Sequence, residues 1–441
     1  MIRIHRDEGP QLLRSAMFAS VKPRLRTSLL LSTTALLAFS MVSCTVPTGE
    51  SNDSGSTEGN ITLGLLAPLT GVAAADGKLM EQGAQLAVDE INAKGGIGGR
   101  KIELKSLDVR DQKSDAVSAA VTQLTSNPNV AAVLTGYAST TNFEIDQLAE
   151  AGIPYLLSGN SGQTKDIIAK NPGKYPGVWS LAPSYEGYST GVPEQLDAWN
   201  SDGTFPLRNR KAYIISSDNA YSNGIASGLV TNLKAKGWEI TGPDTVPFGE
   251  VDDWTTQITK IRQVDPAVII NLDYLTANAS KFLTQFRQNP TQSLVFSQYA
   301  PSVPEFTELA GKNADGVLYN LPFAPLPALS ETKELTRKLT GKYNTEPSLY
   351  SFGLYEQVYL WADAVKQVGD PGKREEVGAA LGKLDKQTTL GRVHFDPATH
   401  LAVAGKDGIP MTYYQIQNGT RLNIAPEEFA DGKFQRPEWI K

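Results

Sequence analysis

Residues 83–104, GAQLAVDEINAKGGIGGRKIEL, join a helical pattern to a strand pattern through a glycine-rich turn. Apolar positions on one predicted helical face recur at the expected spacing: Met80, Ala84, Ala87 and Ile91. The ITLGLL run that begins at Ile61 and the KIELKSL run after the turn both have the character of strands. This stretch therefore predicts a β-α-β unit.

The same alternation of strand and helix continues through a strand at residues 153–157 and starts again after Pro183, with strands at 212–216 and 267–272. Repeated units of this kind predict parallel, doubly wound sheets that helices cover on both faces. We expect an α/β protein of two lobes. Ligands of open α/β sheets bind at the carboxyl ends of the strands, which predicts a binding cleft between the lobes.

The expected lobe boundaries follow the two series. The first lobe takes residues 61–182 and is completed by about 320–395, and the second takes 183–319 and is completed by about 396–441. In the last third we predict long helices at 331–343 and 350–368, followed by a hairpin that pairs residues 393–395 with 413–416.

The composition favours a small-molecule partner. The chain has 441 residues, of which 40% are hydrophobic, and carries a formal net charge of -6. This is enough apolar material for two cores, and a net negative charge gives no reason to expect nucleic-acid binding.

Residues 1–44 are expected to form an export signal. Basic residues precede an apolar run from Leu29 to Val42, which is shorter than the roughly 20 residues that span a bilayer. Met17 is an alternative start, because residues 1–16 add nothing that a signal needs. Such a signal predicts a periplasmic or other extracytoplasmic location.

Cys44 is the only cysteine, and it ends the apolar run directly after Ser43. This arrangement resembles the lipobox of bacterial lipoproteins, which implies a lipid anchor in the membrane at Cys44. The alternative is a soluble protein cut nearby by an ordinary signal peptidase. Residues 45–60 are almost devoid of apolar side chains and are expected to be a flexible linker.

Four segments together resemble the periplasmic receptors for leucine, isoleucine and valine. They are GAQLAVDEINAKGGIGGRKIEL, LLAPLTG at 65–71, VLTGYASTTN at 133–142 and AGIPYLLSGNSG at 151–162. The resemblance covers residues 61–417. It implies a two-lobed flytrap fold with three crossovers, an amino-acid ligand, no catalysis, and the transmembrane subunits of an ABC importer as partner. The expected form is a monomer.

Two polar segments follow adjacent strands and predict a carboxylate site. Ser139 and Thr140 follow a buried strand and open a predicted helix, where hydroxyls and free backbone N–H groups bind anions. The alternative for these two residues is a plain helix N-cap. In SGNSG, Gly159 allows close approach and Ser161 can donate to the same anion. By resemblance, Ser139, Gly159 and Ser161 hold the ligand α-carboxylate.

Tyrosines are expected on the opposite side of the cleft. Tyr221 and Tyr274 match family positions at which tyrosines clamp the ligand, and surface packing is the alternative. Tyr350 is expected mainly in the core, near the rim of the cleft. The ammonium-binding glutamate of the family is replaced by Tyr299.

A buried ammonium still requires a carboxylate. Asp273, at the end of a predicted buried strand, and Asp76, before the first predicted helix, are the candidates, with a helix N-cap as the alternative for Asp76.

The sequence gives little support to an enzymatic function. His394 and His400 lie in the predicted C-terminal hairpin and no cysteine or carboxylate cluster completes a zinc site, so neither a catalytic triad nor a metal or other cofactor is expected. Three alternative functions remain: a hydrolase or sugar-modifying lipoprotein, a receptor for amides or urea, and a flytrap sensor module of a signalling system.

Overall fold

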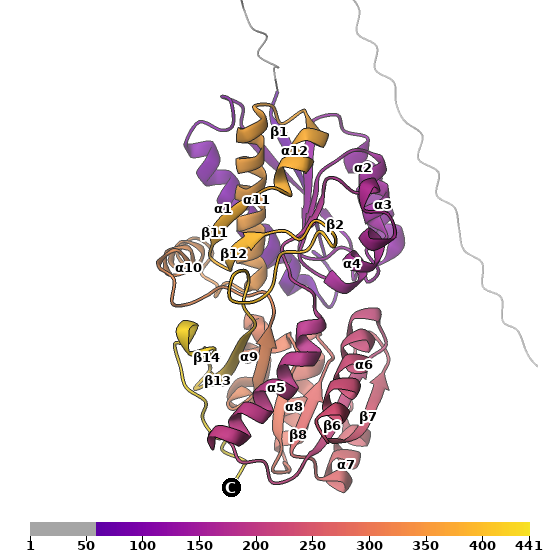
Figure 1. Ribbon diagram of the computed structural model, residues 1–441, viewed down its shortest axis with the longest axis vertical. Helices are drawn as coiled ribbons and strands as arrows, with labels where there is room; N and C mark the ends of the chain where they lie inside the picture. Colours follow the sequence, from indigo (N-terminus) through magenta and orange to yellow (C-terminus); the bar gives the residue numbers. More distant parts are fainter. Residues whose placement is uncertain (1–58) are drawn as a thin grey trace, which may run out of the picture. The chain divides into compact units, whose positions relative to one another are not determined.

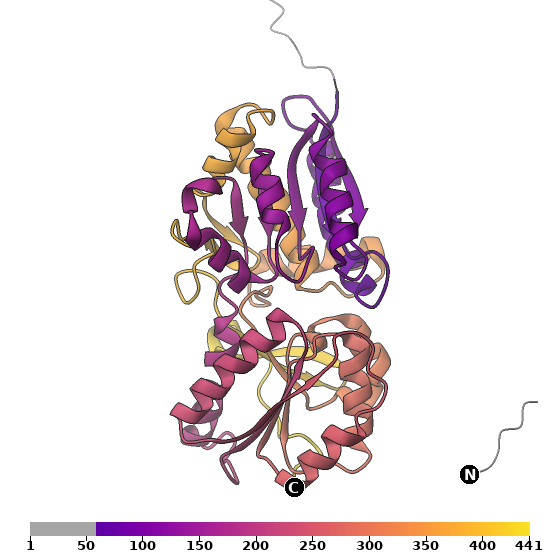
Figure 2. The ribbon, with the colours of Figure 1, turned by 90° about the vertical axis from the view of Figure 1, so that its right-hand side faces the viewer.

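The computed structural model describes residues 59–441 (Figures 1 and 2). The export signal, Cys44 and nearly all of the expected linker lie outside the described residues. Within residues 59–441 two main sheets are present, which we call the sheets of the first and second lobes. No helix in this part of the chain is both long and apolar enough to cross a membrane.

The first-lobe sheet has the strand order β2-β1-β3-β4-β5, and its strand pairs are parallel. Its elements are β1 Ile61–Ala67, α1 Ala74–Ala93, β2 Ile102–Asp108, α2 Ser114–Thr125, β3 Val130–Thr135, α3 Glu144–Glu150, β4 Tyr155–Leu157, α4 Ser161–Lys170 and β5 Val178–Ser180. Every residue of β1 and β3 is buried, as expected for strands covered on both faces.

The second-lobe sheet has the order β14-β13-β10-β9-β8-β6-β7. Its elements are α5 Glu186–Asp202, β6 Lys211–Ser217, α6 Ala220–Ala235, β7 Glu239–Val246, α7 Thr255–Val264, β8 Val268–Asn271, α8 Thr276–Arg287, β9 Leu294–Ser297, α9 Pro304–Ala310, β10 Leu318–Leu321, β13 Thr412–Gln417 and β14 Thr420–Ala425. Strands β6 to β10 pair in parallel, and β13 runs antiparallel to both β10 and β14.

The chain returns to the first lobe after β10. The returning elements are α10 Ser330–Tyr343, α11 Leu349–Val368, α12 Arg374–Leu381, β11 Asp385–Thr388 and β12 Gly391–His394. Figure 1 shows α11 beside α1. A side chain at Gly83 of α1 would place its Cβ 2.0 Å from the backbone oxygen of Ser351, so the close approach of the two helices requires glycine there.

The expected α/β architecture of two doubly wound lobes is confirmed, but two details of the last third are wrong. Residues 393–395 do not pair with 413–416: β12 pairs with β11, and β13 pairs with β10 and β14. In addition, residues 396–402 stay with the first lobe, because Leu401 bridges Ser180 and the imidazole of His400 stacks on Trp179 at 4.1 Å.

Candidate functional site

A cavity of about 60 Å³ lies where loops from both lobes meet. At about 10–15 Å³ for each water, this space holds roughly four to six waters, which matches a small ligand. Its walls include residues just beyond the carboxyl ends of β3, β4, β5, β8 and β9: Tyr137, Gly159, Ala182, Tyr274 and Tyr299. The cavity therefore occupies the place at which open α/β sheets bind ligands.

One wall of the cavity is the N-terminus of α4. Gly159 and Ser161 both line it, and Asn160 between them has a left-handed φ of 53°. No side chain caps the first turn of α4, so its leading N–H groups remain available to an anion. The hydroxyl oxygen of Ser161 accepts the N–H of Tyr185 at 2.8 Å, which leaves the hydroxyl proton to be donated.

Ser139 and Thr140 are not among the residues that line the cavity. The Ser139 hydroxyl donates to Glu144 Oε2 at 2.5 Å and accepts the N–H of Asn142 at 2.8 Å, so both of its hydrogen-bonding roles are taken. The helix that follows β3 begins only at Glu144, later than the sequence suggested. The structure thus gives Ser139 a role within this turn, and no side chain caps the helix that begins at Glu144.

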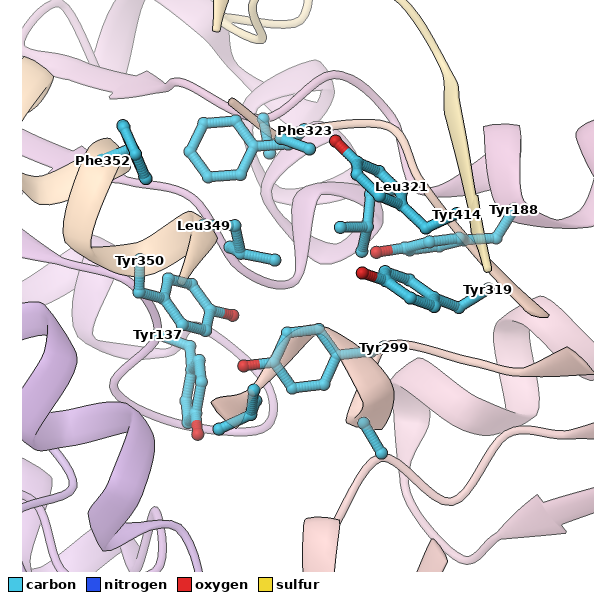
Figure 3. Close-up of a cluster of buried hydrophobic side chains, with 14 of the residues drawn as sticks. Tyr137, Tyr188, Tyr299, Tyr319, Leu321, Phe323, Leu349, Tyr350, Phe352 and Tyr414 are labelled. Atoms are coloured by element: carbon cyan, nitrogen blue, oxygen red, sulfur yellow. The ribbon is translucent and has the colours of Figure 1, made fainter. Parts of the chain in front are cut away.

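Tyrosines form most of the remaining lining. Tyr221, Tyr274 and Tyr299 line the cavity, and so does Tyr350, placed in sequence analysis near the rim. Figure 3 shows Tyr137, Tyr299 and Tyr350 around one space. Tyr299 has a φ of 68°, a costly backbone conformation for a non-glycine residue and one that is frequent at functional sites.

The sequence did not predict three tyrosines and two side-chain amides of the lining: Tyr137, Tyr185, Tyr188, Gln112 and Asn160. Tyr137 offered a signal, because it stands within VLTGYASTTN directly after a buried strand. The Gln112 amide nitrogen donates to the hydroxyl of Tyr274 at 2.9 Å and so joins the two lobes across the cavity wall.

The two candidate carboxylates differ in position. Asp273 is fully buried, accepts hydrogen bonds from the Leu275 N–H at 3.1 Å and the Asn278 amide at 2.8 Å, and lines no part of the cavity. Burial raises the pKa of Asp273 to about 6. Its contacts make it a local cap for the loop after β8.

Asp76 lies behind the tyrosines, in a second cavity of about 10 Å³ whose walls include Tyr137 and Tyr274. Its Oδ2 accepts the Tyr137 hydroxyl at 2.6 Å, and its Oδ1 has no partner among the described residues. Burial raises the pKa of Asp76 to about 6, although the hydroxyls of Tyr137 and Tyr299 partly offset this. Asp76 is not a helix N-cap, since α1 begins at Ala74 and has no side-chain cap.

The two histidines belong to neither cavity. His400 is buried against Trp179, with its Nδ1 3.0 Å from the carbonyl oxygen of Val178, and His394 lies at the end of β12. Within residues 59–441, no three His, Cys, Asp or Glu side chains gather as metal ligands do.

Comparison with known proteins gives a consistent result. The model of the periplasmic binding protein family matches residues 60–420. Leu/Ile/Val-binding protein homolog 3 of Brucella melitensis is 26% identical over 341 residues, which is 73% of this chain and 83% of that protein.

Two solved structures illustrate the similarity of fold. A structure described as a branched-chain amino acid ABC transporter of Silicibacter pomeroyi is 27% identical, with a TM-score of 0.78 over 86% of this chain and 100% of that one. The substrate-binding protein LivJ of Streptococcus pneumoniae, in complex with isoleucine, is 24% identical, with a TM-score of 0.68 over 82% of this chain and 98% of that one. The resemblance carried by residues 83–104 is confirmed, and the chain belongs to the periplasmic binding protein family.

Proposed function

We propose that this chain is the substrate-binding protein of an ABC importer for amino acids, neutral or branched-chain, which it binds between its lobes and delivers to the transmembrane subunits of the permease. The observation that carries the proposal is the pairing of an uncapped helix N-terminus on one side of the cavity with a buried carboxylate, Asp76, behind the other. Such a pair matches the two opposite charges of a small zwitterion.

The α4 N-terminus is proposed as the carboxylate site. The N–H groups of its first turn and the hydroxyl of Ser161 converge there, and charge-assisted hydrogen bonds of this kind are the stronger ones in proteins. The ammonium would then lie toward Tyr137, whose side chain reaches from the Gly159 wall to the Asp76 carboxylate. The carboxylate site and Asp76 are thus separated by about one tyrosine side chain.

The remaining parts of the proposal rest on sequence patterns. Residues 1–44 direct export, Cys44 carries the lipid anchor, and residues 45–60 tether a monomeric, non-enzymatic receptor to the outer face of a membrane. The lobe boundaries proposed for the mature receptor are those of the two sheets, with residues up to 402 in the first lobe.

Titration calorimetry with a panel of neutral L-amino acids, acetamide and urea tests the proposal. We expect the amino acids to bind and the amides, which lack a carboxylate, to bind at least about tenfold more weakly. Ser161→Ala should cost about 1–3 kcal/mol of binding free energy, the usual loss of a charge-assisted hydrogen bond. Thr140→Ala is the matched control, since Thr140 lies outside the cavity lining.

Two outcomes would contradict the proposal. If acetamide or urea displaced alanine, leucine and proline, the site would be an amide or urea site. If Ser161→Ala left the affinity of every amino acid unchanged, the α4 N-terminus would not be the carboxylate site.

A further inference from the structure

A belt of tyrosine rings lines the cavity. Consecutive rings stand at 55° to 88° to one another, with centroids 5.4 to 6.3 Å apart. Because neighbouring rings are steeply inclined, the ring planes along the belt differ in orientation. Followed around the cavity, it runs through Tyr137, Tyr350, Tyr299, Tyr274, Tyr221 and Tyr185.

No charged side chain lines this cavity within residues 59–441. The buried carboxylate of Asp76 lines the adjacent small cavity, and Tyr137 and Tyr274 line both cavities. The two rings therefore separate Asp76 from the main cavity. A ligand in the main cavity is within the field of this negative charge but does not have it as a hydrogen-bond acceptor.

This arrangement discriminates between kinds of ammonium group. A primary ammonium carries three N–H donors, and each donor that loses water without gaining an acceptor costs free energy. An N-methylated ammonium has fewer donors or none, and it is attracted both by aromatic faces and by a nearby negative charge. Aromatic rings backed by a carboxylate that keeps one oxygen without a partner among the described residues suit the second kind of group.

We propose that the cavity selects zwitterions whose ammonium is N-methylated, with a quaternary ammonium held by the tyrosine belt and a carboxylate held at the N-terminus of α4. The inference rests on the proposed function, because the carboxylate end uses the same site. It adds the chemical class of the cationic end, which an amino-acid receptor of this family does not by itself imply.

The test is a methylation series in which only the ammonium changes. Affinities for glycine, N-methylglycine, N,N-dimethylglycine and N,N,N-trimethylglycine are measured by titration calorimetry on the mature chain. We expect the affinity to rise by at least about tenfold from the first to the last. The control ligand is tert-butylacetate, which has the shape of trimethylglycine without its positive charge, and it should bind at least about tenfold more weakly than trimethylglycine.

Variants of the belt assign the effect to its rings. Tyr221→Leu and Tyr274→Leu alter half-buried rings and should each weaken trimethylglycine by about 3- to 30-fold. They should weaken tert-butylacetate less, and the ratio of the two affinities does not depend on the folded fraction of a variant. Tyr359→Leu removes a ring outside the cavity and serves as the control.

The outcomes separate this inference from the proposed function. Three outcomes would overturn the inference and leave the proposed amino-acid receptor intact. They are equal affinity for all four glycine derivatives, equal affinity for tert-butylacetate and trimethylglycine, and tighter binding of valine than of trimethylglycine. If none of the zwitterions, primary amino acids included, bound to the chain, both would fall.

Discussion

Replacing Asp76 by asparagine should raise the stability of the ligand-free protein at neutral pH while it weakens ligand binding. Burial raises the pKa of Asp76 from 3.8 to about 6. The folded state therefore holds a proton that the unfolded state has released, so stability falls as the pH rises through this window. At 1.36 kcal/mol for each pKa unit, the ionised carboxylate costs about 3 kcal/mol above pH 7.

The assay is thermal unfolding of the wild type and of Asp76→Asn at pH 4 and pH 8 after exhaustive dialysis. Any cost of the new amide is the same at both pH values, so it cancels in the comparison. We expect the variant to gain stability relative to the wild type by about 2 kcal/mol or more between the two pH values, since most of the penalty develops there. If the difference in melting temperature between the wild type and Asp76→Asn were the same at pH 4 and pH 8, the reasoning would be refuted.

Ligand binding supplies the second half of this test. A cation near Asp76 offsets the cost of the buried charge, so a zwitterion should stabilise the wild type more than Asp76→Asn at pH 8. Asp273→Asn is the matched control, because Asp273 is likewise buried, also has a pKa raised to about 6, and lines neither cavity. We expect this control to leave ligand affinity unchanged, and a loss as large as that of Asp76→Asn would refute the assignment.

Three further changes have distinct expected results. Ser139→Ala should leave ligand affinity unchanged but destabilise the fold by about 1–3 kcal/mol, because the buried Glu144 carboxylate loses the hydroxyl that donates to it at 2.5 Å. Titration calorimetry measures the affinity, and denaturant unfolding measures the stability. Gly83→Ala should destabilise by roughly 1–3 kcal/mol or more through its contact with Ser351, and an unchanged unfolding midpoint would contradict the packing of α1 on α11. Cys44→Ser should abolish acylation, and a wild-type protein without acyl chains by mass spectrometry would rule out the lipobox.

The alternation of strands and helices was predictable from the sequence because each β-α unit is local. The pairing of strands that lie far apart in the sequence was not predictable. Strand β13 pairs with β10, which lies nearly a hundred residues earlier, and does not form the hairpin that was expected within residues 393–416. The two candidate carboxylates could not be told apart for a similar reason, because Tyr137, which holds Asp76 behind the cavity, lies 61 residues away in the sequence. The bond from the Asn278 amide to Asp273 spans only five residues, but no sequence pattern marked it.

The tyrosine belt could be predicted only in part. Tyr221, Tyr274 and Tyr299 were recognised from the resemblance, which compares each position with its counterpart in the family. Tyr137 follows β3 in the first lobe, whereas Tyr185 and Tyr188 lie at the start of α5, and their contacts with the other rings exist only once the chain has folded. A set of rings brought together in this way has no periodicity in the sequence.

The packing of α11 against α1 has a consequence for biogenesis. The amide of Gln357 on α11 donates to the backbone oxygen of Thr135 at the end of β3, so one face of the first sheet is completed by a helix that the ribosome makes only after strands β6 to β10 of the second lobe. A nascent chain that ends anywhere before residue 349 leaves that apolar face uncovered. Pulse proteolysis of stalled chains should find residues 61–182 unprotected until α11 has emerged. Late completion of this kind delays the folding of the first lobe until most of the chain has been made, which fits the export proposed for residues 1–44.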